Sequence, residues 1–279
     1  MQLGKPSRAA LAAAAHRAAH QALEKGHIFA DPLALCILGE DAETVVRIAK
    51  QDASGRRMRI FVAVRARFAE DALAVAIERG LRQVVVLSAG LDTYAYRSTL
   101  RDRLRIFEVD HPATQAWKRQ RLAAAAIPIP GSLTFAPVDF EHQTLSEGLT
   151  AAGFDPRQQT FFTWLGVVPY LKEEAVWSTL GFIANLPNGA HVVFDYSNPP
   201  ASLSAEIRAS HERRATHVAE LGEAFLSYFE AGDLRAKLMA LGFSKVEDLG
   251  PAQIAARYFP NRVNTVPDKG GHILRATTI

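Results

Sequence analysis

Short apolar runs alternate with longer segments whose apolar residues recur at helical spacing. The short runs are typical of strands buried in a parallel sheet, and the longer segments are typical of helices that cover such a sheet. The predicted strands are residues 84–88, 105–109, 133–139, 160–171 (a strand leading into a loop), 191–197, 243–249 and 272–279. The predicted helices are residues 7–25, 56–79, 111–126, 141–152 and 233–241, with two more starting at Asp31-Pro32 and near Lys172. This alternation predicts an α/β fold with a parallel sheet.

The alternation breaks at residues 198–232, which form a long, polar helical stretch. Such an excursion after a core strand either covers an active site or packs on the surface, and both interpretations stay open. No repeat or low-complexity linker divides the chain. We therefore expect a single domain over residues 1–279, with an N-terminal helical extension (1–55) and a helical cap insertion (198–232).

Composition narrows the class of protein. With 279 residues, 48% of them hydrophobic and 22% charged, the chain resembles an ordinary globular protein with its own core. A net charge of +3 is too small to indicate nucleic-acid binding. The one cysteine, Cys36, lies in the apolar run LALCIL and is expected to be a core residue in a reducing compartment. No run is long enough to span a membrane and no signal peptide is recognisable, so we expect a cytoplasmic protein without a membrane partner.

The most informative segment is VVVLSAGLDTYAYR, residues 84–97. Its small residues Ser88, Ala89 and Gly90 follow the first predicted strand, where a nucleotide-like ligand approaches the backbone closely. Asp110 ends the second strand, about where a carboxylate holds ribose hydroxyls. Asp139 ends the third strand and can accept a hydrogen bond from an adenine amine. Because parallel strands end at a common edge, the segment predicts a site for a nucleoside-bearing cofactor.

Other side chains leave alternatives open. Asp92 either shapes the turn or contacts the ligand, and His111 either caps the following helix or stacks near the ribose. Trp164 is either an apolar wall beside the reacting end of the cofactor or core, and Tyr196 has the same ambiguity.

Several enzyme classes are disfavoured by missing motifs. The glycine pattern is not GxGxxG, which speaks against a nicotinamide-dependent dehydrogenase. No GxSxG elbow and no GxxxxGK[ST] loop occurs, so a serine hydrolase and a P-loop phosphotransferase are disfavoured. The histidines lack paired ligand spacing, so no metal site is predicted.

Eight segments carry a more specific likeness: AHRAAHQ, FADPLA, VRARFAEDAL, AGLDTYAYR, FEVDHPATQAWKR, PVDF, WLGVVPYL and GPAQIAARYFPNR. Together they resemble the leucine carboxyl methyltransferase family, and above all its bacterial branch, which includes polyketide O-methyltransferases. The likeness covers nearly the whole chain. It implies a class I methyltransferase (Rossmann-like) fold, whose seven-stranded, mostly parallel sheet has an antiparallel last strand. It also implies S-adenosyl-L-methionine as the cofactor.

The resemblance assigns roles to individual residues. It implies that Arg65 pairs with the methionine carboxylate of the cofactor, with Arg8 as a second basic contact. The cofactor-binding set that it implies is Arg65, Ser88, Gly90, Asp110 (ribose), Asp139 and Phe140 (adenine), and Trp164. Two positions depart from the family: Ser88 replaces a glycine, and Leu165 replaces a glutamate that many members carry after the fourth strand.

The reaction that this resemblance implies is an in-line displacement that needs alignment more than acid–base chemistry. A carboxylate acceptor needs no general base, whereas a hydroxyl acceptor benefits from one. No residue is identified as that base. The candidate acceptor-side groups are Tyr94, Arg97, Tyr196, Arg257 and Tyr258. We expect O-methylation of a carboxylate or hydroxyl on a small molecule; the alternative, which Ser88 and Leu165 motivate, is a cofactor-binding sensor or assembly partner without transfer activity.

Overall fold

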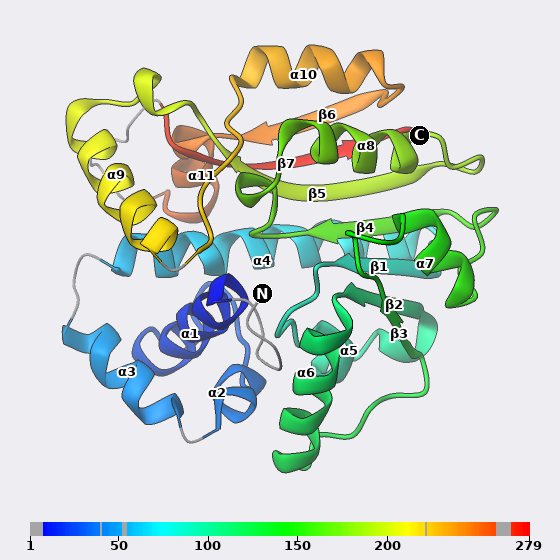
Figure 1. Ribbon diagram of the computed structural model, residues 1–279, viewed down its shortest axis with the longest axis horizontal. Helices are drawn as coiled ribbons and strands as arrows, with labels where there is room; N and C mark the ends of the chain where they lie inside the picture. Colours follow the sequence, from blue (N-terminus) through cyan, green and yellow to red (C-terminus); the bar gives the residue numbers. More distant parts are fainter. Residues whose placement is uncertain (1–7, 40, 52–54, 221, 261–268) are drawn as a thin grey trace. The chain divides into compact units, whose positions relative to one another are not determined.

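A computed structural model describes residues 8–39, 41–51, 55–220, 222–260 and 269–279 (Figure 1). The chain divides into two compact units, Met1–Phe161 (unit 1) and Phe162–Ile279 (unit 2). The expected single domain with its extension and insertion stays a prediction. No helix in the described ranges combines the length and the apolar character needed to cross a membrane.

Unit 1 contains three parallel strands whose carboxyl ends lie together. They are β1 (Gln83–Leu87), β2 (Arg105–Asp110) and β3 (Leu133–Pro137). In the register of the sheet, Leu87 faces Val109 and Asp110 faces Pro137. Every residue of β1 is buried. Four of the five are apolar, and the side-chain amide of the fifth, Gln83, donates to Asp155 O and Thr160 Oγ1. The short segments α5 (Tyr94–Arg97) and η1 (Arg101–Arg103) connect β1 to β2, and the helices α6 (Pro112–Ala124) and α7 (Leu145–Ala151) follow β2 and β3.

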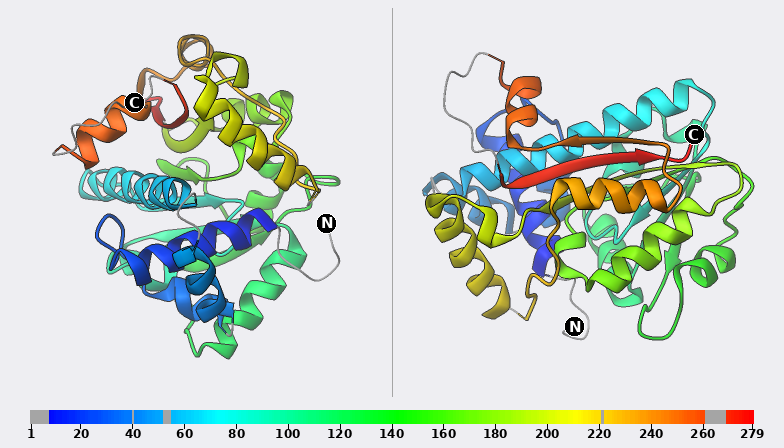
Figure 2. Two further views of the ribbon diagram at one scale, coloured as in Figure 1. Left: turned by 90° about the vertical axis from the view of Figure 1, so that its left-hand side faces the viewer. Right: turned by 90° about the horizontal axis from the view of Figure 1, so that it is seen from above.

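The first four helices of unit 1 precede the sheet in the sequence. They are α1 (Arg8–Leu23), α2 (Leu33–Leu38), α3 (Asp41–Gln51) and α4 (Arg56–Glu78). Helix α1 packs against the other three, and the blue and cyan ribbons lie together in the views of Figures 1 and 2. In α4 a full turn, residues 62–65, is buried, and beyond it the buried residues recur at helical spacing, so that one face of the second half of the helix lies in the core.

Unit 2 contains antiparallel strands. Strand β4 (Thr160–Trp164) spans the boundary between the units, and β5 (Ala190–Ser197), β6 (Lys245–Leu249) and β7 (Gly271–Thr277) follow. Strand β7 is antiparallel to both β5 and β6. The helical segments of unit 2 are η2 (Val168–Tyr170), α8 (Glu173–Ala184), η3 (Pro200–Ser202), α9 (Ala205–Glu220), α10 (Ala231–Ala240) and α11 (Pro251–Tyr258). Helix α8 contacts β5, and α10 and α11 contact β6 (Figure 1).

The seven strands are hydrogen-bonded in the order β3-β2-β1-β4-β5-β7-β6. This order confirms the predicted α/β fold, with a mostly parallel sheet and an antiparallel last strand. All seven predicted strands are present, although several boundaries differ. The fourth strand ends at Trp164, because Gly166 has a φ of 75° and a 3-10 turn follows. The helix expected from residue 141 begins at Leu145, since Thr144 and Glu147 form a capping box there.

Two local predictions were incomplete or wrong. Helices α3, α5 and α11 were not predicted. Cys36 is exposed, contrary to the expected core position, because α2 buries Ala34, Ile37 and Leu38 instead. Residue 7, where the first predicted helix begins, and the last two residues of GPAQIAARYFPNR lie outside the described residues. Helix α9 occupies part of the stretch 198–232, and its role as a cap stays a prediction.

Candidate functional site

The turn after β1 has the backbone shape that its small residues suggest. Ser88 and Gly90 have φ values of 49° and 47°, in the left-handed region that favours glycine. A Cβ atom on Gly90 would lie 2.9 Å from the Cβ of Ala10 in α1, so a larger residue does not fit. The first turn of α1, which begins at Arg8, therefore lies against the glycine turn.

Asp110 connects the end of β2 to this turn. Its Oδ2 accepts a 2.6 Å hydrogen bond from the Gly90 backbone N–H, and its Oδ1 accepts a 2.7 Å bond from the His111 N–H. Burial raises the pKa of the Asp110 carboxyl, and the two N–H donors oppose that rise. The Thr114 side chain also hydrogen-bonds to this carboxyl. Because each carboxylate oxygen has two lone pairs, capacity for a hydroxyl donor remains. Asp110 is thus a fixed acceptor beside a turn that admits close approach.

Asp139 and Phe140 lie in the loop after β3, two and three residues beyond the last residue of that strand. Asp139 Oδ1 accepts a 3.1 Å bond from the Glu141 N–H, which stabilises the turn. Asp139 Oδ2 lies 3.9 Å from His111 Nε2. Phe140 is 58% exposed, which leaves its ring available for stacking on a planar group. His111 thereby links the surroundings of Asp139 to Asp110, its neighbour in the chain.

His111 and Asp92 mainly shape the backbone. The His111 side chain accepts a hydrogen bond from the Ala113 N–H and caps α6, as one of its two interpretations predicted. Asp92 Oδ1 accepts a 2.8 Å bond from the Tyr94 N–H, which is a turn contact.

Glu108 faces a buried cation that sequence reasoning missed. Its carboxylate forms a 2.7 Å ion pair with Lys118 of α6, and both side chains are 1% exposed. The hydroxyl of Tyr96 lies 3.3 Å from the same carboxylate. Burial raises the pKa of Glu108 to about 7, although Lys118 acts in the opposite direction. Glu108 therefore takes part in the packing of α6 on β2; the signal in the sequence was the lysine of FEVDHPATQAWKR.

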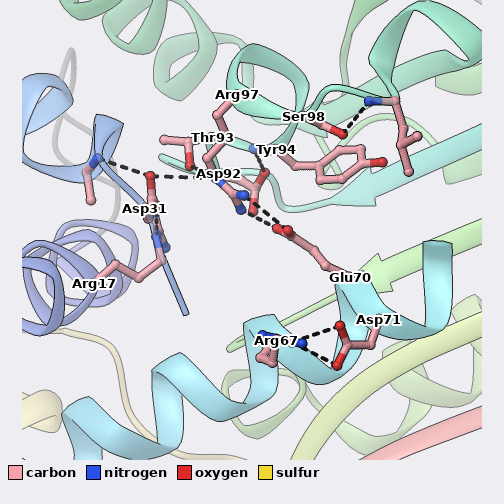
Figure 3. Close-up of polar contacts among 12 residues, drawn as sticks. Arg17, Asp31, Arg67, Glu70, Asp71, Asp92, Thr93, Tyr94, Arg97 and Ser98 are labelled. Carbon is pink, nitrogen blue, oxygen red and sulfur yellow. Dashed lines mark hydrogen bonds and ion pairs between the residues drawn. The ribbon is translucent and has the colours of Figure 1, made fainter. Parts of the chain in front are cut away.

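A network of ion pairs connects the N-terminal helices to the segment after Gly90 (Figure 3). Asp31 is buried and accepts a 2.8 Å bond from Arg17, and Arg97 lies 3.6 Å from its other oxygen. Arg97 also donates to both carboxylate oxygens of Glu70 and, at 3.0 Å, to the Thr93 hydroxyl.

The same network holds the backbone as well as side chains. Arg17 donates a 2.6 Å hydrogen bond to the backbone oxygen of Leu91, the residue after Gly90. Arg17, Asp31, Glu70 and Arg97 come from AHRAAHQ, FADPLA, VRARFAEDAL and AGLDTYAYR respectively. Four of the eight segments noted above therefore meet in one place, and Arg97, a candidate acceptor-side group, has carboxylate partners within unit 1.

The remaining candidates of unit 1 lie on buried parts of the chain. Arg65 is buried on α4. Tyr94 is buried as well, and burial raises the pKa of its hydroxyl.

In unit 2, Trp164 is buried beside Phe194, with ring centroids 6.3 Å apart. Tyr196 is buried, donates a 2.5 Å hydrogen bond to Asp248 and stacks on His272.

Arg257 forms a 2.9 Å ion pair with Glu247, and its guanidinium lies over the ring of its neighbour Tyr258. Among the residues that the structure covers, no group of three or more His, Cys, Asp or Glu side chains is arranged to hold a metal ion.

Of the predicted cofactor-binding residues, the structure brings Gly90 and Asp110 together by a hydrogen bond. His111, the next residue after Asp110, lies near Asp139.

The sheet order and the acids at the ends of β2 and β3 define the class of protein, an α/β protein with a Rossmann-like sheet of the class I methyltransferase type. The family model described as leucine carboxyl methyltransferase matches residues 10–184. The chain belongs to the leucine carboxyl methyltransferase family, as the resemblance implied.

Curated relatives are bacterial. A Bacillus subtilis (strain 168) protein is 34% identical over 200 residues, which cover 71% of this chain and 66% of that protein. A Mycobacterium avium (strain 104) protein is 31% identical over 192 residues, covering 66% of this chain and 61% of that protein. Both carry the provisional name S-adenosyl-L-methionine-dependent methyltransferase. The chain thus matches less than two thirds of the length of these relatives.

A solved structure supports the fold alone. The crystal structure of a Bordetella parapertussis protein, described as a possible exported protein, matches with a TM-score of 0.50 and 13% identity. The match covers 96% of this chain and 95% of that one.

Proposed function

We propose that the protein is an S-adenosyl-L-methionine-dependent methyltransferase that binds the adenosine half of the cofactor at the edge formed by β1, β2 and β3. Membership of the family and the names of the bacterial relatives support this activity. The observation that carries the proposal is the position of the Asp110 carboxylate. Two backbone N–H groups hold it beside Gly90, a turn residue that has no side chain.

The residues present fit the proposed cofactor. Asp110 retains acceptor capacity for ribose hydroxyls, and Asp139 offers a carboxylate to the adenine amine. The exposed ring of Phe140 suits stacking on the base. Arg65, with Arg8 at the start of the helix that touches Gly90, is assigned to the methionine carboxylate.

Catalysis is proposed to rest on alignment. The bound sulfonium group supplies a methyl that is already electrophilic, so the chain must position an acceptor oxygen and exclude water. Tyr196 is poorly suited to act as a base, because burial and the nearby Asp248 raise the pKa of its hydroxyl far above neutral. We propose that the acceptor is a small molecule with a carboxylate or hydroxyl oxygen.

Calorimetry of the full chain with S-adenosylmethionine and S-adenosylhomocysteine tests the cofactor. Asp110→Asn is expected to weaken binding by about 1 to 3 kcal/mol, roughly 5- to 150-fold in Kd, since a carboxylate acceptor is lost. Asp102→Asn, which changes an exposed acid just before β2, is the matched control. Failure of both ligands to bind, or equal effects of the two substitutions, would contradict the proposal.

The nature of the acceptor oxygen requires a second measurement. Transfer from radiolabelled cofactor to panels of carboxylic acids and phenols identifies the accepted class. Mild alkali then separates the products, because a methyl ester releases labelled methanol and an aryl methyl ether does not. Binding without transfer to either panel would contradict the proposed O-methylation.

A further inference from the structure

Helix α9 of unit 2, drawn in yellow in Figure 1, presents an arginine that lacks a carboxylate partner. Within the ranges that the structure describes, no acid forms an ion pair with Arg214, and its Nε is buried without a hydrogen-bond partner. Its guanidinium contacts His211 Nδ1 at 3.3 Å and lies 5.8 Å from the centroid of the Phe225 ring. A half-buried cation without an anion is costly, which points to an acceptor supplied from outside the chain.

The directions of the hydrogen bonds sharpen this argument. A guanidinium can only donate, so the Nδ1 atom of His211 must accept from Arg214. The ring proton of neutral His211 is then on Nε2, which donates to the Tyr228 hydroxyl at 2.9 Å. The hydroxyl hydrogen of Tyr228 is consequently directed elsewhere. Arg214 Nε and the Tyr228 hydroxyl thus both offer donors, and within the described residues no acceptor is recorded for Arg214 Nε.

The protonation states agree with this arrangement. Burial lowers the pKa of His211, and the Arg214 guanidinium lowers it further, which keeps the imidazole neutral. Burial also lowers the pKa of Arg214, and the groups that oppose this are the phenols Tyr170 and Tyr228 rather than a carboxylate.

Aromatic rings surround these donors. The rings of His211 and Phe225 are stacked, with centroids 5.5 Å apart, and the ring centroids of Tyr170 and Phe225 are 5.1 Å apart. The segment that carries Phe225 and Tyr228 is fixed to η2, because Leu226 N–H donates to Pro169 O at 2.7 Å and the Ser227 hydroxyl donates to Val168 O at 2.8 Å. The rings and donors are therefore held in place before any ligand binds.

We propose that Arg214, Tyr228 and the rings of Tyr170, His211 and Phe225 form a binding site for a small aromatic acid, with its carboxylate on Arg214. One guanidinium among aromatic rings matches one negative charge on a planar body. A phosphate dianion is usually held by several cations or by helix N–H groups.

All five residues belong to unit 2, so the site and its test do not depend on the cofactor proposed for unit 1.

The test compares benzoate with benzamide, its neutral analogue of the same shape, as probes of the full chain by ligand-observed NMR titration. We expect benzoate to bind roughly tenfold more tightly than benzamide, because only benzoate pairs with the guanidinium. Arg214→Gln abolishes the preference, and Arg214→Lys retains part of it. Arg213→Gln, at an exposed neighbour on the same helix, leaves it unchanged. If Arg214→Gln does not fold, Tyr228→Phe takes its place and is expected to weaken benzoate binding severalfold without affecting benzamide.

Three outcomes overturn the site: equal binding of the two probes to the wild type, a full preference that survives Arg214→Gln (or unchanged benzoate binding to Tyr228→Phe in its place), or displacement of benzoate by an equal concentration of inorganic phosphate. S-adenosylhomocysteine binding, measured on the same samples, separates the two proposals. If S-adenosylhomocysteine binds and benzoate shows no preference, the aromatic-acid site is wrong and the methyltransferase proposal stands. If S-adenosylhomocysteine fails to bind, the methyltransferase proposal is wrong, while the benzoate result still decides the site.

Discussion

The ion pair between Arg97 and Glu70 is expected to stabilise the fold of unit 1. Replacing Arg97 with Met and Glu70 with Gln, singly and together, gives a double-mutant cycle that isolates their coupling. Arg97 also bonds to the Thr93 hydroxyl, pairs with Asp31 and lies over the Phe29 ring. Arg97→Met therefore removes more than one interaction, and the cycle is needed to separate them.

The burial of Arg97 and Glu70 determines how large their coupling free energy should be. The side chains of Arg97 and Glu70 are 14% and 26% exposed, and two charge-assisted hydrogen bonds join them. We expect a coupling free energy of about 2 kcal/mol, as for hydrogen bonds to charged groups. Arg97→Met alone is expected to cost about 3 to 5 kcal/mol, because Glu70 and Asp31 each lose a cation.

A control ion pair lies on α4, the helix that carries Glu70. Arg67 and Asp71 form an exposed ion pair on α4, with side chains 52% and 42% exposed (Figure 3). Its coupling is expected to be at most about 0.5 kcal/mol, since water screens exposed pairs. Urea unfolding followed by far-UV circular dichroism measures both cycles. A coupling for Arg97 and Glu70 no larger than for the control would refute the structural role. Loss of methyl transfer at unchanged stability would then favour Arg97 as an acceptor-side group.

Three further changes test the glycine turn and the buried acid. Ser88→Gly is expected to raise the free energy of unfolding by about 1 kcal/mol by relieving the positive φ, while Ser88→Ala leaves it nearly unchanged; lower stability of the glycine variant would contradict this. Gly90→Ala should cost about 1 to 3 kcal/mol in urea unfolding, and Ala10→Gly should restore part of the loss. The folded pKa of Glu108, about 7, exceeds its ordinary value of 4.5. The contribution of Glu108 to stability is therefore fully present below pH 4.5 and is lost as the pH rises through 7. Over that range the free energy of unfolding of the wild type should fall by about 3 kcal/mol relative to that of Glu108→Gln. A difference between the two proteins that stays flat or rises with pH would refute the assignment.

The strands and the glycine turn could be predicted because local physics determines them. Most residues of a buried parallel strand are apolar, and a tight turn favours small residues. Helix α3 was missed although Ala42, Val45, Val46 and Ala49 recur at helical spacing, because this stripe is short and none of its residues is fully buried. Cys36 was misjudged because a six-residue helix is too short for its apolar face to be recognised within the run LALCIL.

Side-chain partners distant in sequence could not be predicted. Glu108 and Asp110 are two positions apart on β2, but the sequence could not show that Lys118 pairs with the first and that backbone N–H groups hold the second. Likewise, the acid partners of Arg97 are Glu70 of α4 and Asp31, two residues before α2. Because both are distant in sequence, the sequence alone left Arg97 as a candidate for contact with the acceptor.

The network around Asp31 explains why the N-terminal helices and the glycine turn form one structural element. Arg17 of α1 holds both the Asp31 carboxylate and the Leu91 backbone oxygen, and Ala10 of the same helix occupies the space that a side chain on Gly90 would need. The backbone on either side of the Asp110 contact with Gly90 is therefore fixed by α1 rather than by the sheet alone. It follows that a residue in a segment that resembles the family need not touch a ligand: Arg17 and Asp31 shape the turn, whereas the proposed contact with the ribose falls to Asp110.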